Sequence, residues 1–283
     1  MDIASLNTKY GIAGTLEFAL GKGGLPMARI TSSHADAVIS LYGAQVLSYR
    51  PKGKEEALWM SAQSLFEEAK AIRGGIPVCF PWFGAHATDK TKPQHGFARI
   101  SLWDVAGAEL EQDGTACLRL SLRDTERTHA LWPHAFSAEL EVRVGSSLEV
   151  ALTCTNTGSA ELTYTDALHT YLAVSDIGSV LLRGLGSCTY YEATETAPLR
   201  QEEALLEIDR VVNRRYIDTE AECVIEDRGV PRTISVAKKG SRITVVWNPW
   251  KEGARSMADM EDDGYRTMLC VEAVNTLGDA VVL

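Results

Sequence analysis

The chain has 283 residues, of which 45% are apolar, and a formal net charge of −10. This length and composition allow one large all-β domain or two ordinary domains with a substantial core. The acidic balance argues against nucleic acid or an anionic membrane as a partner, because both need a basic face, so an anionic ligand requires a local basic pocket. No segment resembles a signal peptide or a membrane span, and we expect a cytoplasmic protein, most simply a monomer.

The first part of the chain predicts a strand over residues 37–49 and a short helix over residues 62–69, from the spacing of the apolar side chains. Two segments rich in glycine and arginine follow, AIRGGIPVCFPWFG at residues 71–84 and QHGFAR at residues 94–99. Arg73 precedes two glycines, which would let a ligand approach the main chain, and its guanidinium offers a planar fork of donors. The two segments therefore suit an oxygen-rich, anionic small molecule.

The middle of the chain shows the alternation of apolar and polar residues that is typical of strands. Residues 134–144 alternate strictly, the turn Gly-Ser-Ser follows, and residues 148–154 repeat the pattern, which predicts a β-hairpin. Similar runs predict further strands over residues 116–122, 161–174, 180–185, 233–237, 243–247 and 267–274.

Helical periodicity is scarce, and the only other short candidate is residues 254–257, which follow the sequence WNPW. No linker, charge block or repeat divides the chain, and no strand is followed by a glycine-rich nucleotide-binding motif. We therefore predict that residues 1–283 form a single all-β domain, a large antiparallel β-sandwich with few short helices.

A candidate acid and a candidate base lie in two of these strands. His169 shares a strand face with Ala167 and Tyr171, where a histidine is more often structural unless it has a partner. Glu272 supplies one, since it lies in the apolar run LCVEAV, where a carboxylate is costly to bury without a partner or a task. Burial would raise its pKa toward the range of a general base. The acidic run at residues 259–263 is predicted to be a solvated loop.

Aromatic and sulfur-containing residues are less specific signals. Trp82, Phe83, Trp247 and Trp250 would suit stacking on a sugar ring, although core packing is the better explanation for any single one of them. The six cysteines are spread widely without a CxxC pair, which favours buried free thiols over disulfides or a zinc site.

Five ordered motifs, RGGIPVCFPWFG, QHGFAR, ALHTYLAV, WNPW and DDGYRTMLCVEAVN, together resemble the glucose-6-phosphate 1-epimerases, which are hexose-6-phosphate mutarotases related to aldose 1-epimerase. The resemblance extends from GAQVLSYRP, which begins at Gly43, to the C-terminal strand. It implies a β-sandwich of the galactose-mutarotase type and an isomerase that interconverts the α and β anomers of a hexose 6-phosphate, with glucose 6-phosphate favoured. It implies no metal and no organic cofactor.

The resemblance also implies roles for individual residues. His169 would be the catalytic acid and Glu272 the catalytic base, and a sugar phosphate would be bound by Arg73, Gln94 and Arg99, with His95 as a further contact or a structural hydrogen-bonding group. The aspartate of the family's VDRIY segment falls on Asn213, a departure that puts one sugar-hydroxyl contact in doubt, and Asp209 is a rival for that position.

Two other functions remain open at this point. A noncatalytic carbohydrate or sugar-phosphate binding module would keep the sandwich without turnover, although the presence of both His169 and Glu272 argues against it. A glycoside hydrolase needs two carboxylates that flank the scissile bond, and only Glu272 lies in a strong motif.

Overall fold

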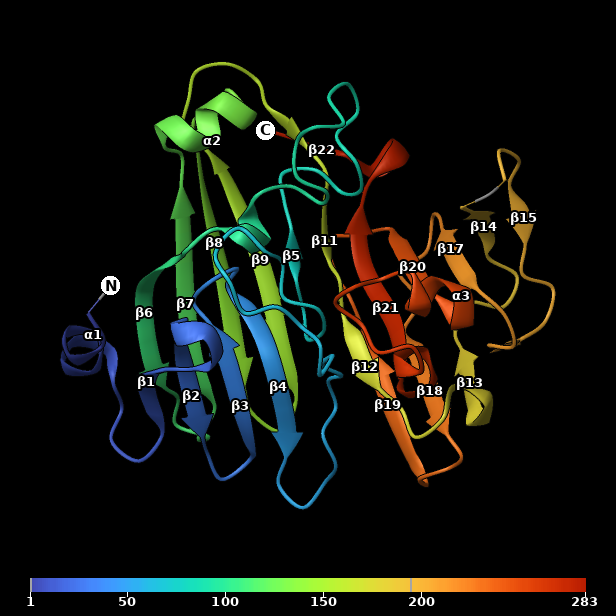
Figure 1. The fold of residues 1–283 in the computed structure, drawn as a ribbon, viewed down its shortest axis with the longest axis horizontal. Helices are drawn as coiled ribbons and strands as arrows, with labels where there is room; N and C mark the ends of the chain where they lie inside the picture. Colours follow the sequence, from blue (N-terminus) through green and yellow to red (C-terminus); the bar gives the residue numbers. More distant parts are fainter. Residues whose placement is uncertain (1, 194) are drawn as a thin grey trace.

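The computed structural model describes residues 2–193 and 195–283, most of which lie in antiparallel β-sheets (Figure 1). The all-β prediction is confirmed. The α-helices are short: α1 (Ile3–Tyr10), α2 (Glu126–Leu131) and α3 (Trp250–Arg255). Single 3-10 turns span Lys22–Gly24, Ala98–Ile100, Ile177–Ser179, Gly264–Thr267 and Leu277–Asp279. No helix among the described residues is long and apolar enough to cross a membrane.

The N-terminal half contains two four-stranded sheets that share one hydrophobic core (Figure 1). One sheet has the order β1-β2-β3-β4 and the other β6-β7-β8-β9. In β8 the buried side chains come from alternate positions, whereas the first three residues of β4 are all buried. The strands are β1 (Leu16–Leu20), β2 (Pro26–Thr31), β3 (Ala35–Ser40), β4 (Gln45–Pro51), β6 (Asp104–Leu110), β7 (Ala116–Arg123), β8 (Phe136–Val144) and β9 (Leu148–Asn156).

The hairpin predicted over residues 134–154 is formed by β8 and β9, which pair from Phe136 opposite Asn156 to Val144 opposite Leu148. The predicted strand over residues 37–49 is interrupted, because the chain turns between β3 and β4 and the two segments pair with each other. Alternation indicated the strands of these two segments, but it did not show where β3 ends and β4 begins.

The C-terminal half is built on an eight-stranded sheet of order β15-β14-β17-β20-β21-β11-β5, in which β12 also pairs with β21 (Figure 1). A small sheet of order β16-β13-β18-β19 accompanies it, and β10 pairs with β22. The strands are β5 (Val78–Cys79), β10 (Thr163–Tyr164), β11 (Asp166–Leu168), β12 (Tyr171–Ala173), β13 (Val180–Arg183), β14 (Thr189–Glu192), β15 (Leu199–Arg200), β16 (Leu205–Glu207), β17 (Val212–Tyr216), β18 (Cys223–Asp227), β19 (Arg232–Val236), β20 (Ile243–Asn248), β21 (Met268–Asn275) and β22 (Val281–Val282).

The prediction of a helix over residues 62–69 is wrong, because that segment forms turns instead. Its backbone is held by tertiary contacts: Glu261 accepts hydrogen bonds from the Ser61 hydroxyl at 2.8 Å and from the Ala62 N–H at 2.7 Å. The helix predicted over residues 254–257 begins earlier, as α3. That the whole chain forms a single domain stays a prediction.

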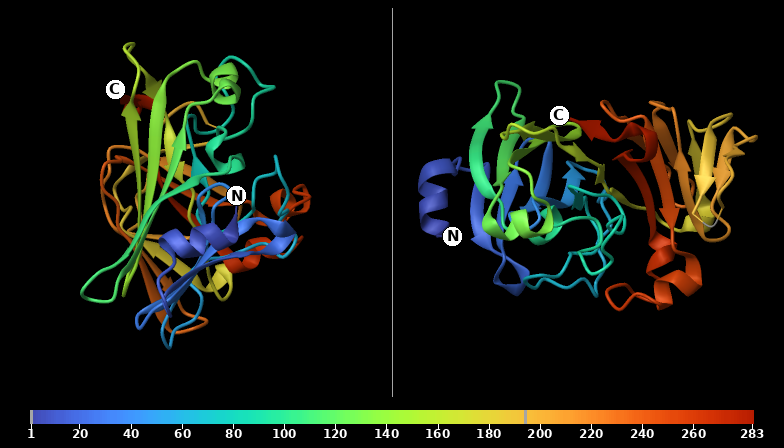
Figure 2. Two further views of the ribbon diagram at one scale, coloured as in Figure 1. Left: turned by 90° about the vertical axis from the view of Figure 1, so that its left-hand side faces the viewer. Right: turned by 90° about the horizontal axis from the view of Figure 1, so that it is seen from above.

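The loop that carries residues 80–98 and the helix α3 lie on the same side of the large sheet (Figure 2). The side chain of Asn248 fixes the second of these elements. It is fully buried at the end of β20, donates to the Tyr265 and Met268 carbonyls at 2.8 and 2.9 Å, and accepts from the Trp250 N–H at 2.9 Å. The WNPW sequence therefore serves mainly to anchor α3 and the segment before β21 beside the sheet.

One half-buried carboxyl in β11 should make stability depend on pH. Burial raises the pKa of Asp166 from its ordinary value of 3.8 to about 7, which the neighbouring Asn275 offsets only in part. As the pH rises from about 4 to about 7, the unfolded chain loses this proton while the folded protein keeps it, so stability falls over that interval and is level above it.

We therefore expect Asp166→Asn to be more stable than the parent at about pH 8, by about 2 kcal/mol. That is roughly half the full value of about 1.4 kcal/mol per pKa unit, because the side chain is only half-buried. Urea unfolding at several pH values measures the difference. An equal effect of the substitution at about pH 4 and pH 8 would contradict this assignment.

Candidate active site

The register of the large sheet places side chains from four strands in one row. Asn213 of β17 lies opposite Trp247 of β20, Trp247 opposite Cys270 of β21, and Cys270 opposite Tyr171 of β12. Side chains at paired positions point to the same face of a sheet. In the adjacent row of that face, Arg215, Val245 and Glu272 are paired in turn. Residues that are distant in sequence thus form one continuous surface.

His169 lies at the break between β11 and β12 and meets Glu272 across this surface. The His169 Nδ1 and Glu272 Oε1 atoms are 3.4 Å apart, and the two side chains are 10% and 1% exposed. The ring of Tyr171 stacks on the His169 ring at a centroid distance of 4.7 Å, with 9° between the planes. Trp247 meets the His169 ring edge-on at 5.9 Å. The imidazole is thereby held in one orientation toward the carboxylate.

Burial shifts the pKa values of this pair in opposite directions. It raises the pKa of Glu272 well above its ordinary range, because a carboxylate is poorly solvated there. It lowers the pKa of His169 well below its ordinary value, and the charges of His95, Arg99 and Arg73 lower it further. The pair thus tends to hold one proton, on either the carboxyl or the imidazole, and moving that proton between them leaves their total charge unchanged.

Arg73 is fixed by a paired carboxylate. Its Nε and Nη2 atoms donate to the two oxygens of Asp259 at 3.2 and 3.1 Å, and its Nη1 donates to the Tyr171 hydroxyl at 3.0 Å. The prediction that residues 259–263 form only a solvated loop is therefore wrong for Asp259. Part of the charge of Arg73 is already neutralised.

The two glycines after Arg73 serve the fold. A Cβ on Gly74 would lie 2.5 Å from the Trp59 carbonyl oxygen, and one on Gly75 would lie 2.1 Å from the Val46 carbonyl oxygen. Gln45, which is fully buried, donates to the Gly74 carbonyl at 2.6 Å. The interpretation that these glycines admit a ligand to the main chain is not supported, because the carbonyl groups of Trp59 and Val46 occupy the space beside them.

Arg99 differs from Arg73 in having no carboxylate partner among the described residues. Its Nη2 donates to the main-chain carbonyl of Gln94 at 2.8 Å, and its Nε is buried without a hydrogen-bond partner. Gln94 is exposed, and its contact with Arg99 is made by the main-chain carbonyl and not by the side-chain amide. A half-buried guanidinium without a counter-ion is the kind of group that binds an anion.

His95 adopts a left-handed backbone conformation with a φ of 61°. Its Nδ1 accepts a hydrogen bond from the Gly84 N–H at 3.1 Å, which leaves the proton on Nε2. Burial lowers its pKa to about 3, with Arg99 and Arg73 contributing, so the ring is neutral near pH 7. Its ring centroid is 5.8 Å from that of His169. His95 thus makes a structural hydrogen bond through Nδ1, while its Nε2 donor has no hydrogen-bond partner among the described residues.

The two rivals for the family's aspartate position have different surroundings. Asp209 is exposed and pairs with its neighbour Arg210 at 3.0 Å, whereas Asn213 lies in the same row as Trp247 and Cys270. Only Asn213 is on the face that carries Glu272.

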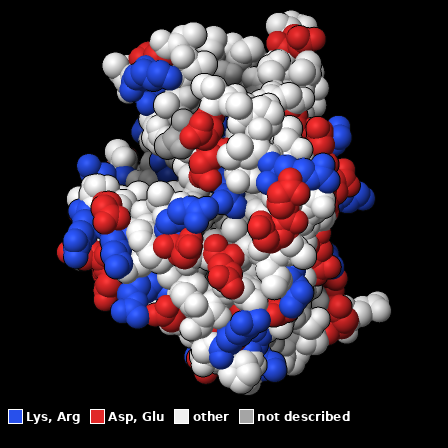
Figure 3. Space-filling model, turned by 90° about the vertical axis from the view of Figure 1, so that its right-hand side faces the viewer, with Lys and Arg blue, Asp and Glu red and all other residues white. Residues whose placement is uncertain are grey.

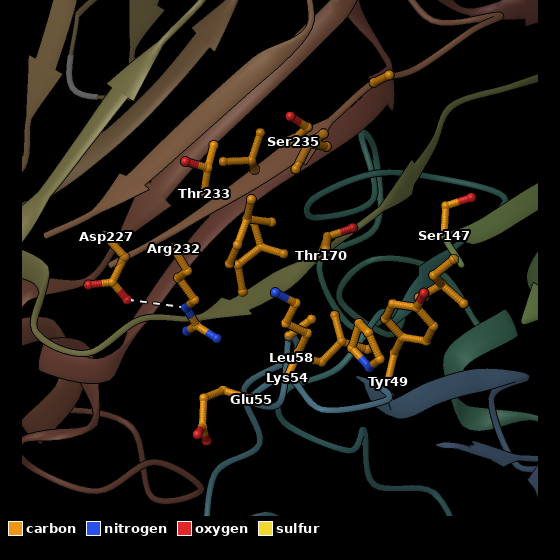
Figure 4. Close-up of a pocket in the computed structure, with 18 of the residues that line it drawn as sticks. Tyr49, Lys54, Glu55, Leu58, Ser147, Thr170, Asp227, Arg232, Thr233 and Ser235 are labelled. Carbon is orange, nitrogen blue, oxygen red and sulfur yellow. Dashed lines mark hydrogen bonds and ion pairs between the residues drawn. The ribbon is translucent and has the colours of Figure 1, made fainter. Parts of the chain in front are cut away.

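The opposite face of β21 borders a large cleft, which is drawn in Figure 4. This cleft of about 1290 Å³ contains Val271 and Ala273, which alternate with Cys270 and Glu272 along the strand. It also contains Thr170, next to His169 in the chain. The acid–base pair therefore points away from this cleft, because successive side chains of a strand face opposite sides.

Comparisons with known proteins agree with this geometry. Residues 26–283 match the family model described as aldose 1-epimerase. The chain belongs to the aldose 1-epimerase family. A protein of Salmonella typhimurium named "Putative glucose-6-phosphate 1-epimerase" is 37% identical over 84% of this chain and 79% of its own length, and one of Escherichia coli with the same name is 37% identical over 83% and 78%.

The fold of the family is also matched among solved structures. The crystal structure described as a "putative mutarotase (YeaD)" from Salmonella typhimurium superposes with a TM-score of 0.87 and 33% identity, over 94% of this chain and 88% of that one. The β-sandwich of the galactose-mutarotase type, which the sequence motifs implied, is thus confirmed.

Sequence reasoning did not assign a role to Tyr171, Asp259 or Cys270. Tyr171 was detectable, because alternation put it on the same strand face as His169. The other two carried no local signal: Asp259 is one of several acidic residues in a loop, and Cys270 is one of several cysteines in apolar strands. Their relevance depends on which distant side chains lie beside them.

Proposed function

We propose that this aldose 1-epimerase family member interconverts the α and β anomers of a hexose 6-phosphate, with glucose 6-phosphate as the favoured substrate. The observation that carries the proposal is the buried contact of His169 with Glu272 beside Arg99, a cation without a carboxylate partner among the described residues. In this proposal His169 is the acid, Glu272 is the base and Arg99 is the anion-binding group, and the charge of Arg99 is close enough to His169 to lower its pKa.

Anomer exchange requires the sugar ring to open, the aldehyde to turn about one bond, and the ring to close on the other face. In this proposal Glu272 takes the proton from the anomeric hydroxyl while His169 gives a proton to the ring oxygen, and both transfers reverse on closure. The raised pKa of Glu272, caused by its burial, suits a base that works near neutral pH.

His169 must carry a proton to act as the acid, and burial opposes that state in the free protein. A bound dianionic phosphate supports the protonated state, because negative charge near an imidazolium raises its pKa. We expect binding of the sugar phosphate to move the shared proton from Glu272 toward His169, which prepares the pair for ring opening.

Arg99 would hold the phosphate, assisted by Arg73, since the charges of both arginines act on His95. The surface around the C-terminal sheet does not provide a broad basic face for this purpose, since acidic and basic side chains are interspersed there (Figure 3). Asn213 would contact a sugar hydroxyl. The half-buried ring of Trp247 would pack on the apolar face of the sugar ring.

The direct test is the rate of exchange between the anomeric protons of glucose 6-phosphate, measured by NMR with the protein kept in EDTA. We expect exchange well above the rate in buffer alone, because the residues placed in the reaction need no metal. A rate equal to the buffer rate would overturn the catalytic proposal and favour a noncatalytic sugar-phosphate binding module.

A further inference from the structure

Cys270 lies beside the acid–base pair and has no part in the proton transfers proposed above. It precedes Glu272 by two residues in β21, so both side chains point to the same face of the sheet. The ligand atoms of His169, Cys270 and Glu272, one from each residue, all lie within 4.8 Å of one another. All three residues are buried.

These positions suit a transition-metal ion. Zinc binds sulfur at about 2.3 Å and histidine nitrogen or carboxylate oxygen at about 2.0–2.2 Å, so neighbouring ligand atoms of a tetrahedral site are about 3.3–3.8 Å apart. The His169 Nδ1 and Glu272 Oε1 atoms, at 3.4 Å, already have this spacing. A mixture of imidazole, thiolate and carboxylate favours zinc or cobalt over magnesium or calcium, which prefer oxygen ligands.

A second observation also points to a ligand at this place. The Nδ1 atom of His169 and the Oε2 atom of Glu272 are buried, and neither has a hydrogen-bond partner among the described residues. Buried polar atoms usually have a partner, because leaving one unsatisfied costs about 1–3 kcal/mol. Coordination would satisfy the nitrogen and the carboxylate together.

Three protein ligands leave one position of a tetrahedral ion open. The His169 side chain is the most exposed of the three ligands, at 10%, so an ion would enter from its side of the sheet. His95 and Trp247 border that side, with ring centroids 5.8 and 5.9 Å from His169. Water or a sugar hydroxyl would fill the fourth position.

We propose that His169, Cys270 and Glu272 form a binding site for a thiophilic divalent ion of the zinc type, and that occupation of this site inhibits the enzyme. On binding, the ion loses water ligands, and the Cys270 thiol proton and the proton shared by the other two residues pass to solvent. The inhibition rests on the proposed function, since the ion takes the nitrogen and the carboxylate that would transfer protons. Binding of the ion to these three residues does not depend on the proposed function.

Cobalt(II) tests the site without any assay of activity, because thiolate coordination produces a charge-transfer absorption band. The protein is stripped with a chelator and titrated anaerobically with Co²⁺. We expect the band to saturate at about one equivalent and to disappear when Zn²⁺ is added in excess. Absence of the band would overturn the proposal.

Matched cysteine variants identify the ligand. We expect Cys270→Ser to lose the thiolate band and Cys79→Ser to keep it, since Cys79 is equally buried on β5, which pairs with β11 of the same sheet, but is outside the group. Cys270→Ala serves as a second variant, and circular dichroism checks that each one folds. A band that persists in both Cys270 variants would assign the metal to other ligands and overturn the proposal.

Anomer exchange then tests inhibition, with each variant compared with its own metal-free rate. We expect Zn²⁺ to inhibit the parent and Cys79→Ser, EDTA to restore both, and Cys270→Ser to require at least about tenfold more Zn²⁺. Equal sensitivity of Cys270→Ser would overturn the inhibitory role. A metal-free parent without exchange activity would defeat the proposed function alone, since the cobalt band decides the metal site separately.

Discussion

Replacing Glu272 by glutamine is expected to lower the rate of anomer exchange by about 100-fold or more, with substrate binding largely retained. The substitution keeps the shape of the side chain but removes the base, and a positioned general base typically contributes about 100- to 10,000-fold. Turnover by NMR exchange, together with substrate affinity by calorimetry, measures the two effects separately.

Glu207→Gln is a suitable control. Glu207 is an exposed glutamate in β16, so this substitution makes the same chemical change away from the site. It should have parental activity. A fully active Glu272→Gln would place the base elsewhere, and Asp259, which pairs with Arg73, would be the next carboxylate to replace.

His169 should act as one unit with Glu272. His169→Asn removes the acid and is expected to cost about as much as Glu272→Gln, while the double variant should be scarcely slower than either single variant. The reason is that a lone acid or a lone base cannot complete the exchange of protons that ring opening requires. Losses that multiply in the double variant would indicate independent roles.

Replacing Arg99 by alanine is expected to lower kcat/KM for glucose 6-phosphate by about tenfold or more while hardly changing that for free glucose. Loss of a hydrogen bond to a charged group costs roughly 1.5–3 kcal/mol, which corresponds to at least a tenfold change. Arg99 makes no ion pair with the described residues, so its removal leaves no carboxylate behind without a partner.

Arg73→Ala provides an informative contrast. It would leave Asp259 without its arginine partner and remove the donor to the hydroxyl of Tyr171, whose ring stacks on His169, so we expect losses on both substrates. Arg242→Ala, an exposed arginine paired with Asp218, is a control that should change neither. Equal losses on both substrates for Arg99→Ala would show that Arg99 contacts the sugar ring or supports the fold.

Much of the fold was predictable from local sequence, because a strand with one buried face requires apolar residues at every second position. The β8–β9 hairpin follows from two alternating runs and a Gly-Ser-Ser turn. Helices were less predictable. Residues 62–69 have a helical spacing of apolar side chains, but their backbone is held as turns by Glu261, which lies about two hundred residues away in sequence.

The residues of the candidate site were likewise predictable only in part. The sequence by itself marked His169, Glu272, Arg73 and Arg99, because each lies in a motif whose chemistry is unusual for its local surroundings. Only the tertiary structure decided that Arg73 is paired with Asp259 while Arg99 is not, and that Cys270 lies beside His169 and Glu272. Side-chain alternation is a local property that a few consecutive residues encode, whereas ion pairing and ligand clusters depend on the order and register of strands that meet from distant parts of the chain.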